Sequence, residues 1–196
     1  SEPYITDFFF AGTPAVSEDC LYINITTGAA QPGEKRPVYM WFHGGGLNNG
    51  FPYEAEFDPS ELARKGIVVV SVAQRLNVFG YLALPQLRAE QGGTSGNYGL
   101  MDQLQALNWV YENIAAFGGD PDNITAGGQS GGSQKACAMA FSPASKGRVK
   151  RIILESGLKI LQQYPAPEEM EQKSRAFLKG LGIDPDASPD ELRAID

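Results

Sequence analysis

The chain contains little cysteine and little histidine, with two cysteines and one histidine among 196 residues. Two cysteines cannot make a disulfide framework, and the separation of Cys20 from Cys137 fits no metal-binding motif. We expect both to be small buried side chains, the alternative for Cys20 being a partner upstream of Ser1. One histidine without a ligand cluster predicts neither a metal site nor an organic cofactor.

Long apolar runs and basic clusters are also missing from the sequence. No apolar stretch approaches the roughly 18–20 residues that a membrane-spanning helix needs. The net charge is −7 and there is no basic stripe, so we expect no nucleic-acid partner. Residues 1–7 are acidic rather than basic, which is not how a signal peptide begins, and the cellular location stays open.

The apolar pattern predicts strands that alternate with helices. The expected strands cover residues 19–26, 37–42, 67–73, 123–128 and 151–155. The expected helices cover residues 59–65, 98–116 and 131–141. The apolar face of the long helix is expected at Leu100, Leu104, Leu107, Tyr111 and Ile114. This alternation predicts an α/β fold with a mostly parallel sheet covered by helices.

The composition changes after Pro165. Pro167 and the acidic residues behind it predict the start of a helix, which Gly180 and Gly182 end. Residues 188–191 (SPDE) form a capping box that opens another helix shortly before the sequence stops. We therefore divide the chain into residues 1–164, the first part of the core, and residues 165–196, the start of a helical segment that is truncated.

Residues 128–132 (GQSGG) form the only G-x-S-x-G motif of the chain. In a nucleophile elbow the serine occupies a strained turn between a strand and a helix, and the flanking glycines relieve the crowding there. A predicted strand precedes this motif and a helix-compatible run of small residues follows it. Ser130 is therefore a candidate nucleophile, and the alternative is a simple strand-to-helix turn.

Residues 43–46 (HGGG) directly follow a predicted buried strand. Acyl transfer needs preorganised N–H donors for an oxyanion, and a glycine-rich loop together with the N–H after the nucleophile can supply them. The expected donors are Gly45, Gly46 and Gly131. Two alternatives are a phosphate-binding loop, for which no G-x-G-x-x-G or P-loop pattern is present, and a flexible turn.

Several blocks of the sequence together resemble the type-B carboxylesterases, the cholinesterase-like family. They are residues 17–24 (SEDCLYIN), 43–46, 74–82 (QRLNVFGYL), 96–103 (GNYGLMDQ), 113–121 (NIAAFGGDP) and 128–132. The resemblance implies an α/β-hydrolase fold, here without its C-terminal part, with residues 1–164 in its core. It also implies a nucleophile at Ser130 and oxyanion donors at Gly45, Gly46 and Gly131.

The resemblance further implies buried charged positions at Glu18, Asp19, Arg75 and Asp102, which we interpret as structural ion pairs. The chain departs from the family in two residues of the elbow. Gln129 stands where the family usually carries an acid, and Gly131 stands where alanine is common. The region before the first block is also shorter than usual.

A serine nucleophile needs a base, and the only histidine of the chain is His43. The resemblance places His43 in the oxyanion loop and the catalytic acid and histidine far downstream of the nucleophile, outside this chain. We therefore expect a fragment, inactive alone, of a serine hydrolase that cleaves small-molecule carboxylic esters through an acyl-enzyme. The alternatives are a non-catalytic cholinesterase-like binding or adhesion module, and His43 itself as the base.

The substrate walls are not predicted by this sequence. Phe51 and Tyr53 follow the glycine loop closely and are candidates either for an apolar pocket or for ordinary packing. The identity of the ester and the oligomeric state stay open.

Overall fold

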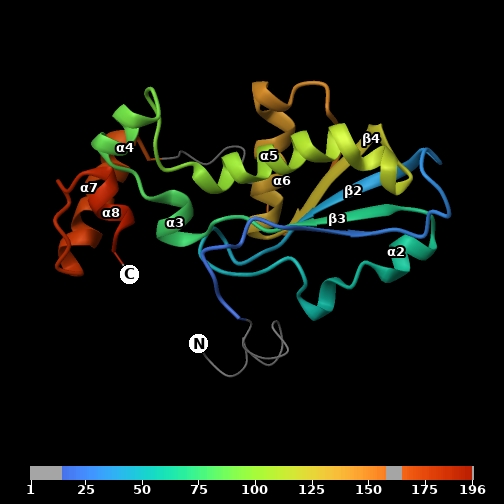
Figure 1. Ribbon diagram of the computed structural model, residues 1–196, viewed down its shortest axis with the longest axis horizontal. Helices are drawn as coiled ribbons and strands as arrows, with labels where there is room; N and C mark the ends of the chain where they lie inside the picture. The colour runs from blue at the N-terminus through green and yellow to red at the C-terminus, as the bar shows by residue number, and fades with distance from the viewer. Residues whose placement is uncertain (1–14, 158–164, 196) are drawn as a thin grey trace.

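The computed structural model describes residues 15–157 and 165–195, and its centre is a five-stranded sheet of order β1-β3-β2-β4-β5 (Figure 1). The strands are β1 Ile23–Thr26, β2 Arg36–Phe42, β3 Val68–Val72, β4 Gly119–Gln129 and β5 Val149–Glu155. β1 pairs antiparallel with β3, whereas β2 is parallel to β3 and β4, and β4 is parallel to β5. The predicted mostly parallel sheet is confirmed.

Helices cover both faces of this sheet (Figure 1). α5 (Tyr98–Asn113) and α6 (Gly131–Phe141) lie on one face, and α2 (Ser60–Arg64) lies on the other. The remaining α-helices are α3 Asn77–Tyr81, α4 Pro85–Glu90, α7 Pro167–Gly180 and α8 Pro189–Arg193, and the 3₁₀ turns are Ala55–Phe57, Ile114–Phe117 and Pro143–Ser145. α3 and α4 were not predicted, because helices this short carry no full apolar period.

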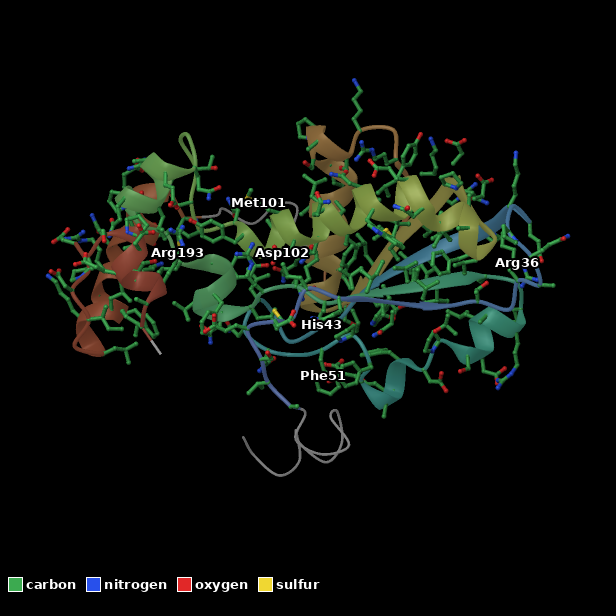
Figure 2. The ribbon with its side chains drawn as sticks, in the orientation of Figure 1. Arg36, His43, Phe51, Met101, Asp102 and Arg193 are labelled. Carbon is green, nitrogen blue, oxygen red and sulfur yellow. The ribbon has the colours of Figure 1, made fainter. Side chains whose placement is uncertain are left out.

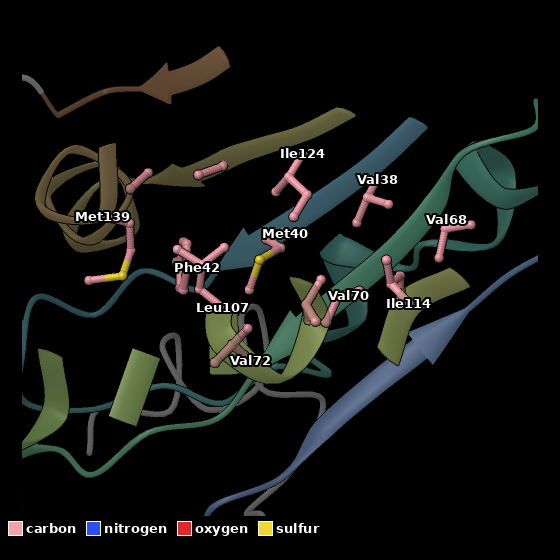
Figure 3. Close-up of a cluster of buried hydrophobic side chains, with 13 residues drawn as sticks. Val38, Met40, Phe42, Val68, Val70, Val72, Leu107, Ile114, Ile124 and Met139 are labelled. Carbon is pink, nitrogen blue, oxygen red and sulfur yellow. The ribbon is translucent and has the colours of Figure 1, made fainter. Parts of the chain in front are cut away.

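The main hydrophobic core lies between the sheet and the pair α5 and α6 (Figure 3). Val38, Met40 and Phe42 alternate along β2 and are almost fully buried on this side. β3 adds Val68, Val70 and Val72 to the same layer. Each large apolar side chain buried here contributes about 1.5–3 kcal/mol relative to exposure. This layer fixes the register of β2 and β4, whose ends carry the glycine loop and the elbow.

The buried face of α5 differs from the predicted one. Its buried positions are Gln103, Leu107 and Val110, and Ile114 continues them into the following turn. Tyr111 was expected on this face but is 37% exposed. The buried positions begin earlier, at Gly99, so the first two of them, Gly99 and Gln103, are not among the large apolar residues that an apolar period counts. The sequence prediction was correct for Leu107 and Ile114 and wrong for Tyr111.

The first family block is less buried than the resemblance implied. β1 begins at Ile23, not at residue 19, and both Glu18 and Asp19 are exposed. Asp19 accepts a hydrogen bond from the hydroxyl of Tyr22 (2.7 Å) and makes no ion pair among the described residues. The prediction of structural ion pairs at these two acids is therefore wrong. Cys20 is half-buried, whereas Cys137 is buried as expected.

The prediction of structural ion pairs is confirmed for Arg75 and Asp102, which the structure shows to be each other's partners. The guanidinium of Arg75 donates to both carboxylate oxygens of Asp102, at 2.9 Å from Nε and 2.6 Å from Nη2, and the Arg75 backbone N–H adds a third bond at 2.9 Å. Hydrogen bonding to Asp102 raises the pKa of Arg75. The pair fixes the segment that follows β3 to helix α5.

α7 and α8 pack against α4, away from the main core (Figure 1). Leu178 of α7 meets Leu84 and Leu87 in a second apolar cluster. The predicted capping box of α8 is confirmed, because Ser188 and Glu191 exchange both hydrogen bonds. The division of the chain between residues 164 and 165 adjoins residues 158–164, outside the described part, and stays a prediction.

Candidate active site

Ser130 lies at the junction of β4 and α6 in a strained backbone conformation. Its φ of 55° and ψ of −116° fall where non-glycine residues seldom occur, at a cost of about 1–3 kcal/mol. The backbone N–H of Ser130 donates to the Glu155 carbonyl on β5 (2.8 Å), and its own carbonyl accepts from the Ser133 N–H (3.1 Å). The sequence motif therefore has the strand-turn-helix geometry that a nucleophile elbow requires.

Close backbone approach explains the glycines on either side of the serine. A Cβ atom on Gly128 would lie 2.4 Å from the carbonyl oxygen of Phe42, and one on Gly132 would lie 1.9 Å from the same oxygen. Both distances are far inside van der Waals contact. The backbone of the elbow is thus in direct contact with the end of β2, the strand that leads into the glycine loop.

The structure places the glycine loop against the elbow. Gly45 and Gly46 have φ values of 78° and 65°, and the Gly45 carbonyl closes a turn by accepting from the Asn48 N–H (3.2 Å). A Cβ atom on Gly131 would lie 2.6 Å from the Gly46 nitrogen and 2.4 Å from the Gly46 oxygen. Gly46 and Gly131, two of the three predicted oxyanion donors, are therefore in contact, and Gly44 lies beside Ser130.

Gln129, the residue that departs from the family pattern, lies under this loop. Its side-chain oxygen would be 2.9 Å from a Cβ atom on Gly44. A neutral amide thus occupies the position next to the loop where the resemblance leads one to expect a carboxylate.

His43 is buried and is not placed to act as the base for Ser130. Its Nδ1 lies 3.0 Å from the Gly44 carbonyl oxygen, and its Nε2 lies 2.7 Å from the side-chain amide of Gln74. Burial, followed by the charge of Lys135, lowers the pKa of His43 to about 3. The ring is therefore neutral at physiological pH and packs as part of the loop support.

Lys135 and Glu54 are site neighbours that our sequence reasoning missed. The side chain of Lys135 projects from α6, is fully buried, and donates to the His43 carbonyl at 3.0 Å. Burial lowers its pKa to about 7, and burial also raises the pKa of Glu54. The available signal was a lysine in the middle of an otherwise small and apolar helix.

The two aromatic residues after the loop contact each other. The ring centroids of Phe51 and Tyr53 are 4.6 Å apart, Tyr53 is 61% exposed, and the Phe51 N–H donates to Glu54 at 3.3 Å. Figure 2 shows Phe51 below His43 on the same side of the molecule. Their role in a substrate pocket stays a prediction.

A cavity of about 210 Å³ lies on the α2 side of the sheet, among Tyr39, Trp41 and Phe57. The described ranges contain no group of three or more His, Cys, Asp or Glu side chains that could hold a metal ion. Nor does any helix in those ranges have both the length and the apolar character to cross a membrane.

Comparison with known proteins places this geometry in a family. The family model described as the carboxylesterase family matches residues 3–193. The chain is 40% identical over 183 residues to the para-nitrobenzyl esterase of Bacillus subtilis (strain 168) and 43% identical over 147 residues to the fumonisin B1 esterase of Sphingopyxis macrogoltabida. These alignments cover 93% and 74% of the chain.

The fold agrees with the sequence comparison. The crystal structure of a Geobacillus stearothermophilus carboxylesterase superposes with a TM-score of 0.82 at 39% identity, over 93% of this chain. The fold is that of an α/β-hydrolase. Within that class, the chain belongs to the carboxylesterase family.

The chain spans only part of the length of these relatives. It covers 36% of the Bacillus esterase, 27% of the fumonisin B1 esterase and 39% of the Geobacillus chain.

Proposed function

We propose that the protein is a serine carboxylesterase in which Ser130 is the nucleophile and Gly45, Gly46 and Gly131 donate N–H groups to the oxyanion. The observation that carries this proposal is the strained backbone of Ser130 at the β4–α6 junction, with Gly46 packed against Gly131. Strain of this kind persists only where the surrounding structure enforces it. A simple strand-to-helix turn needs neither the strain nor the glycine contact.

In the proposed mechanism the Ser130 hydroxyl oxygen attacks the carbonyl carbon of an ester. Negative charge develops on the carbonyl oxygen, where the loop and elbow N–H groups and the N-terminus of the 11-residue helix α6 stabilise it. The alcohol then leaves, and water hydrolyses the acyl-enzyme to release the acid. Removal of one oxyanion donor typically costs about 10²–10³ in kcat.

The base that takes the Ser130 proton is proposed to lie outside these 196 residues. His43 is the only histidine in the sequence, and both of its ring nitrogens lie within hydrogen-bonding distance of other groups. The family resemblance places the acid and histidine of the triad downstream of the nucleophile. Residues 1–196 alone are accordingly expected to be inactive.

The proposed substrate class is a small-molecule carboxylic ester. The names of the Bacillus and Sphingopyxis relatives describe ester hydrolysis on very different molecules. The similarity therefore supports cleavage of an ester bond as the reaction and does not indicate a particular ester.

The proposal is tested on the protein as its gene encodes it, with a p-nitrophenyl ester and a fluorophosphonate probe. We expect the probe to label Ser130, and Ser130→Ala to lose label and at least about 10³-fold of kcat. Ser142→Ala is the matched control, because half-buried Ser142 lies at the other end of α6, where its side chain caps the turn Pro143–Ser145. Absence of label and of hydrolysis in the wild-type protein would refute the enzyme and favour a binding module.

A further inference from the structure

The buried amine of Lys135 lies next to the start of the glycine loop. Lys135 is fully buried, although lysine is almost never found in that state without a partner. Its Nζ donates to the His43 carbonyl at 3.0 Å. That carbonyl is the last main-chain acceptor before the three consecutive glycines of the loop, so this hydrogen bond fixes the point from which the loop departs.

Helix packing explains why Lys135 reaches this carbonyl. Gly132 lies one turn earlier on the same face of α6, and a Cβ atom there would lie 2.9 Å from the His43 oxygen. The missing side chain of Gly132 lets α6 approach β2 closely. The long side chain of Lys135 then extends along this contact.

A second contact connects the amine to the histidine ring. With the Gln74 amide oriented to satisfy its neighbours, its oxygen accepts from Lys135 Nζ (2.9 Å) and, in the tautomer of the neutral ring that carries its proton on Nε2, from His43 Nε2 (2.7 Å). The Gln74 nitrogen then donates to the Val72 carbonyl at 3.2 Å. Lys135 thus holds both the backbone and, through Gln74, the side chain of His43.

Glu54 and His43 are the titratable groups that interact with the amine of Lys135, and Glu56 acts on Glu54. Glu54, in the segment before the 3₁₀ turn at Ala55–Phe57, is 6% exposed and attracts the protonated amine, while Glu56 lies near Glu54. The His43 ring is neutral near pH 7, because burial lowers its pKa to about 3. Burial brings the pKa of Lys135 to about 7, so its proton is gained or lost close to neutral pH.

We propose that Lys135 is a positioning residue for the oxyanion loop, whose protonated ammonium holds the His43 carbonyl and whose deprotonation weakens that hold. A charged donor makes a hydrogen bond roughly twice as strong as a neutral one. The catalytic consequence rests on the function proposed above, whereas the structural consequence does not. The two are therefore measured separately.

The structural measurement follows the carbonyl of His43 by NMR. Histidine labelled with ¹³C at the carbonyl and glycine labelled with ¹⁵N select the His43–Gly44 pair, the only His-Gly pair in these 196 residues. We expect the carbonyl shift to titrate near pH 7 in the wild-type protein and to be flat across this range in Lys135→Met. A flat wild-type signal overturns the proposal.

Glu54→Gln provides a second variant that leaves the lysine in place. Because the Glu54 carboxylate favours the protonated amine, its neutralisation should move the midpoint down by about one pH unit. Lys150→Met is the matched control, since exposed Lys150 donates to the Gly147 carbonyl on the surface at 2.6 Å. It should keep the wild-type midpoint. A midpoint that Glu54→Gln leaves unchanged contradicts the proposal, and this holds even if Lys135→Met fails to fold.

The catalytic measurement compares kcat in the protein as its gene encodes it. We expect wild type to exceed Lys135→Met about tenfold at pH 6 and only about two- to threefold above pH 8, with KM unchanged, because the oxyanion forms only in the transition state. A ratio independent of pH overturns the positioning role and leaves the esterase proposal intact. A titrating carbonyl without any hydrolysis refutes the esterase proposal and supports the structural role.

Discussion

At the scale of single residues, the elbow depends on glycines, whose missing side chains leave room for neighbouring backbone atoms. Gly128 and Gly132 leave room for the Phe42 carbonyl, and Gly131 leaves room for Gly46. The G-x-S-x-G pattern predicted crowding at Gly128 and Gly132, and the structure showed that the crowding atom is the Phe42 carbonyl oxygen. The contact of Gly131 involves a loop 85 positions away, and no local pattern predicts it.

The Gly132→Ala substitution is expected to destabilise the protein by about 3 kcal/mol or more. Its Cβ would lie 1.9 Å from a backbone oxygen, which cannot move without breaking the end of β2. Urea denaturation measures the change. Gly180→Ala is the control, because a Cβ there meets nothing within 4 Å, and we expect a change within about 1 kcal/mol. Similar values for the two variants would contradict this account.

At the scale of elements, the site is the meeting point of three segment ends. β2 leads into the glycine loop, β4 leads into the elbow, and β5 supplies the Glu155 carbonyl that accepts from the Ser130 N–H. Because these three strands are parallel neighbours, their carboxyl ends lie at the same edge of the sheet. The Arg75–Asp102 pair fixes α5 to the end of β3 at that edge.

The Asp102→Asn substitution is expected to cost about 1–3 kcal/mol of stability. Asp102 is nearly buried and accepts three hydrogen bonds from Arg75, whose side chain is partly exposed, so solvent screens part of the loss. Thermal or urea unfolding measures it. Glu169→Gln removes the exposed pair with Lys173 and should change stability by no more than about 0.5 kcal/mol. An equal effect from both would contradict the importance of burial.

At the scale of the whole molecule, the described chain has two apolar clusters of unequal size. The larger lies between the sheet and helices α5 and α6, and the smaller joins α4 to α7 and α8. Arg193 of α8, which is labelled in Figure 2, adds a charged contact to Glu90 of α4, with 2.9 Å between Nη1 and Oε1. The smaller cluster therefore holds residues 165–195 beside α4 and not against the main core.

Lys135 should make the free energy of unfolding rise with pH between about 7 and 10.5, a contribution that the raised pKa values of Cys20 and Cys137 oppose above about pH 9. Burial lowers the pKa of Lys135 from 10.5 to about 7, so within this window the unfolded chain binds a proton that the folded chain has released. The slope is at most about 1.4 kcal/mol per pH unit. Urea denaturation at several pH values measures it. Lys135→Met should lose this slope and Lys150→Met should keep it, and a slope retained in Lys135→Met would contradict the assignment.

The sequence by itself determined the order of strands and helices, the elbow motif, the glycine loop and the family resemblance. The strands and longer helices depend on local spacing, such as the apolar run of β2 or the small residues of α6, and the structure confirms them, whereas the short helices α3 and α4 were missed. The family resemblance depends on several sequence blocks taken together. The resemblance gave Arg75 and Asp102 as ion-pairing positions, and the structure showed that they pair with each other.

Only the tertiary structure decided which residues support the site. It showed that Glu18 and Asp19 are exposed, that Tyr111 lies outside the buried stripe, and that Lys135 is buried under His43. These facts depend on which segments pack together. The residue type alone does not tell whether a lysine on a helix is exposed to solvent or buried. Burial changes its pKa and its hydrogen-bond partners because water is excluded there, and that exclusion is a property of the folded chain.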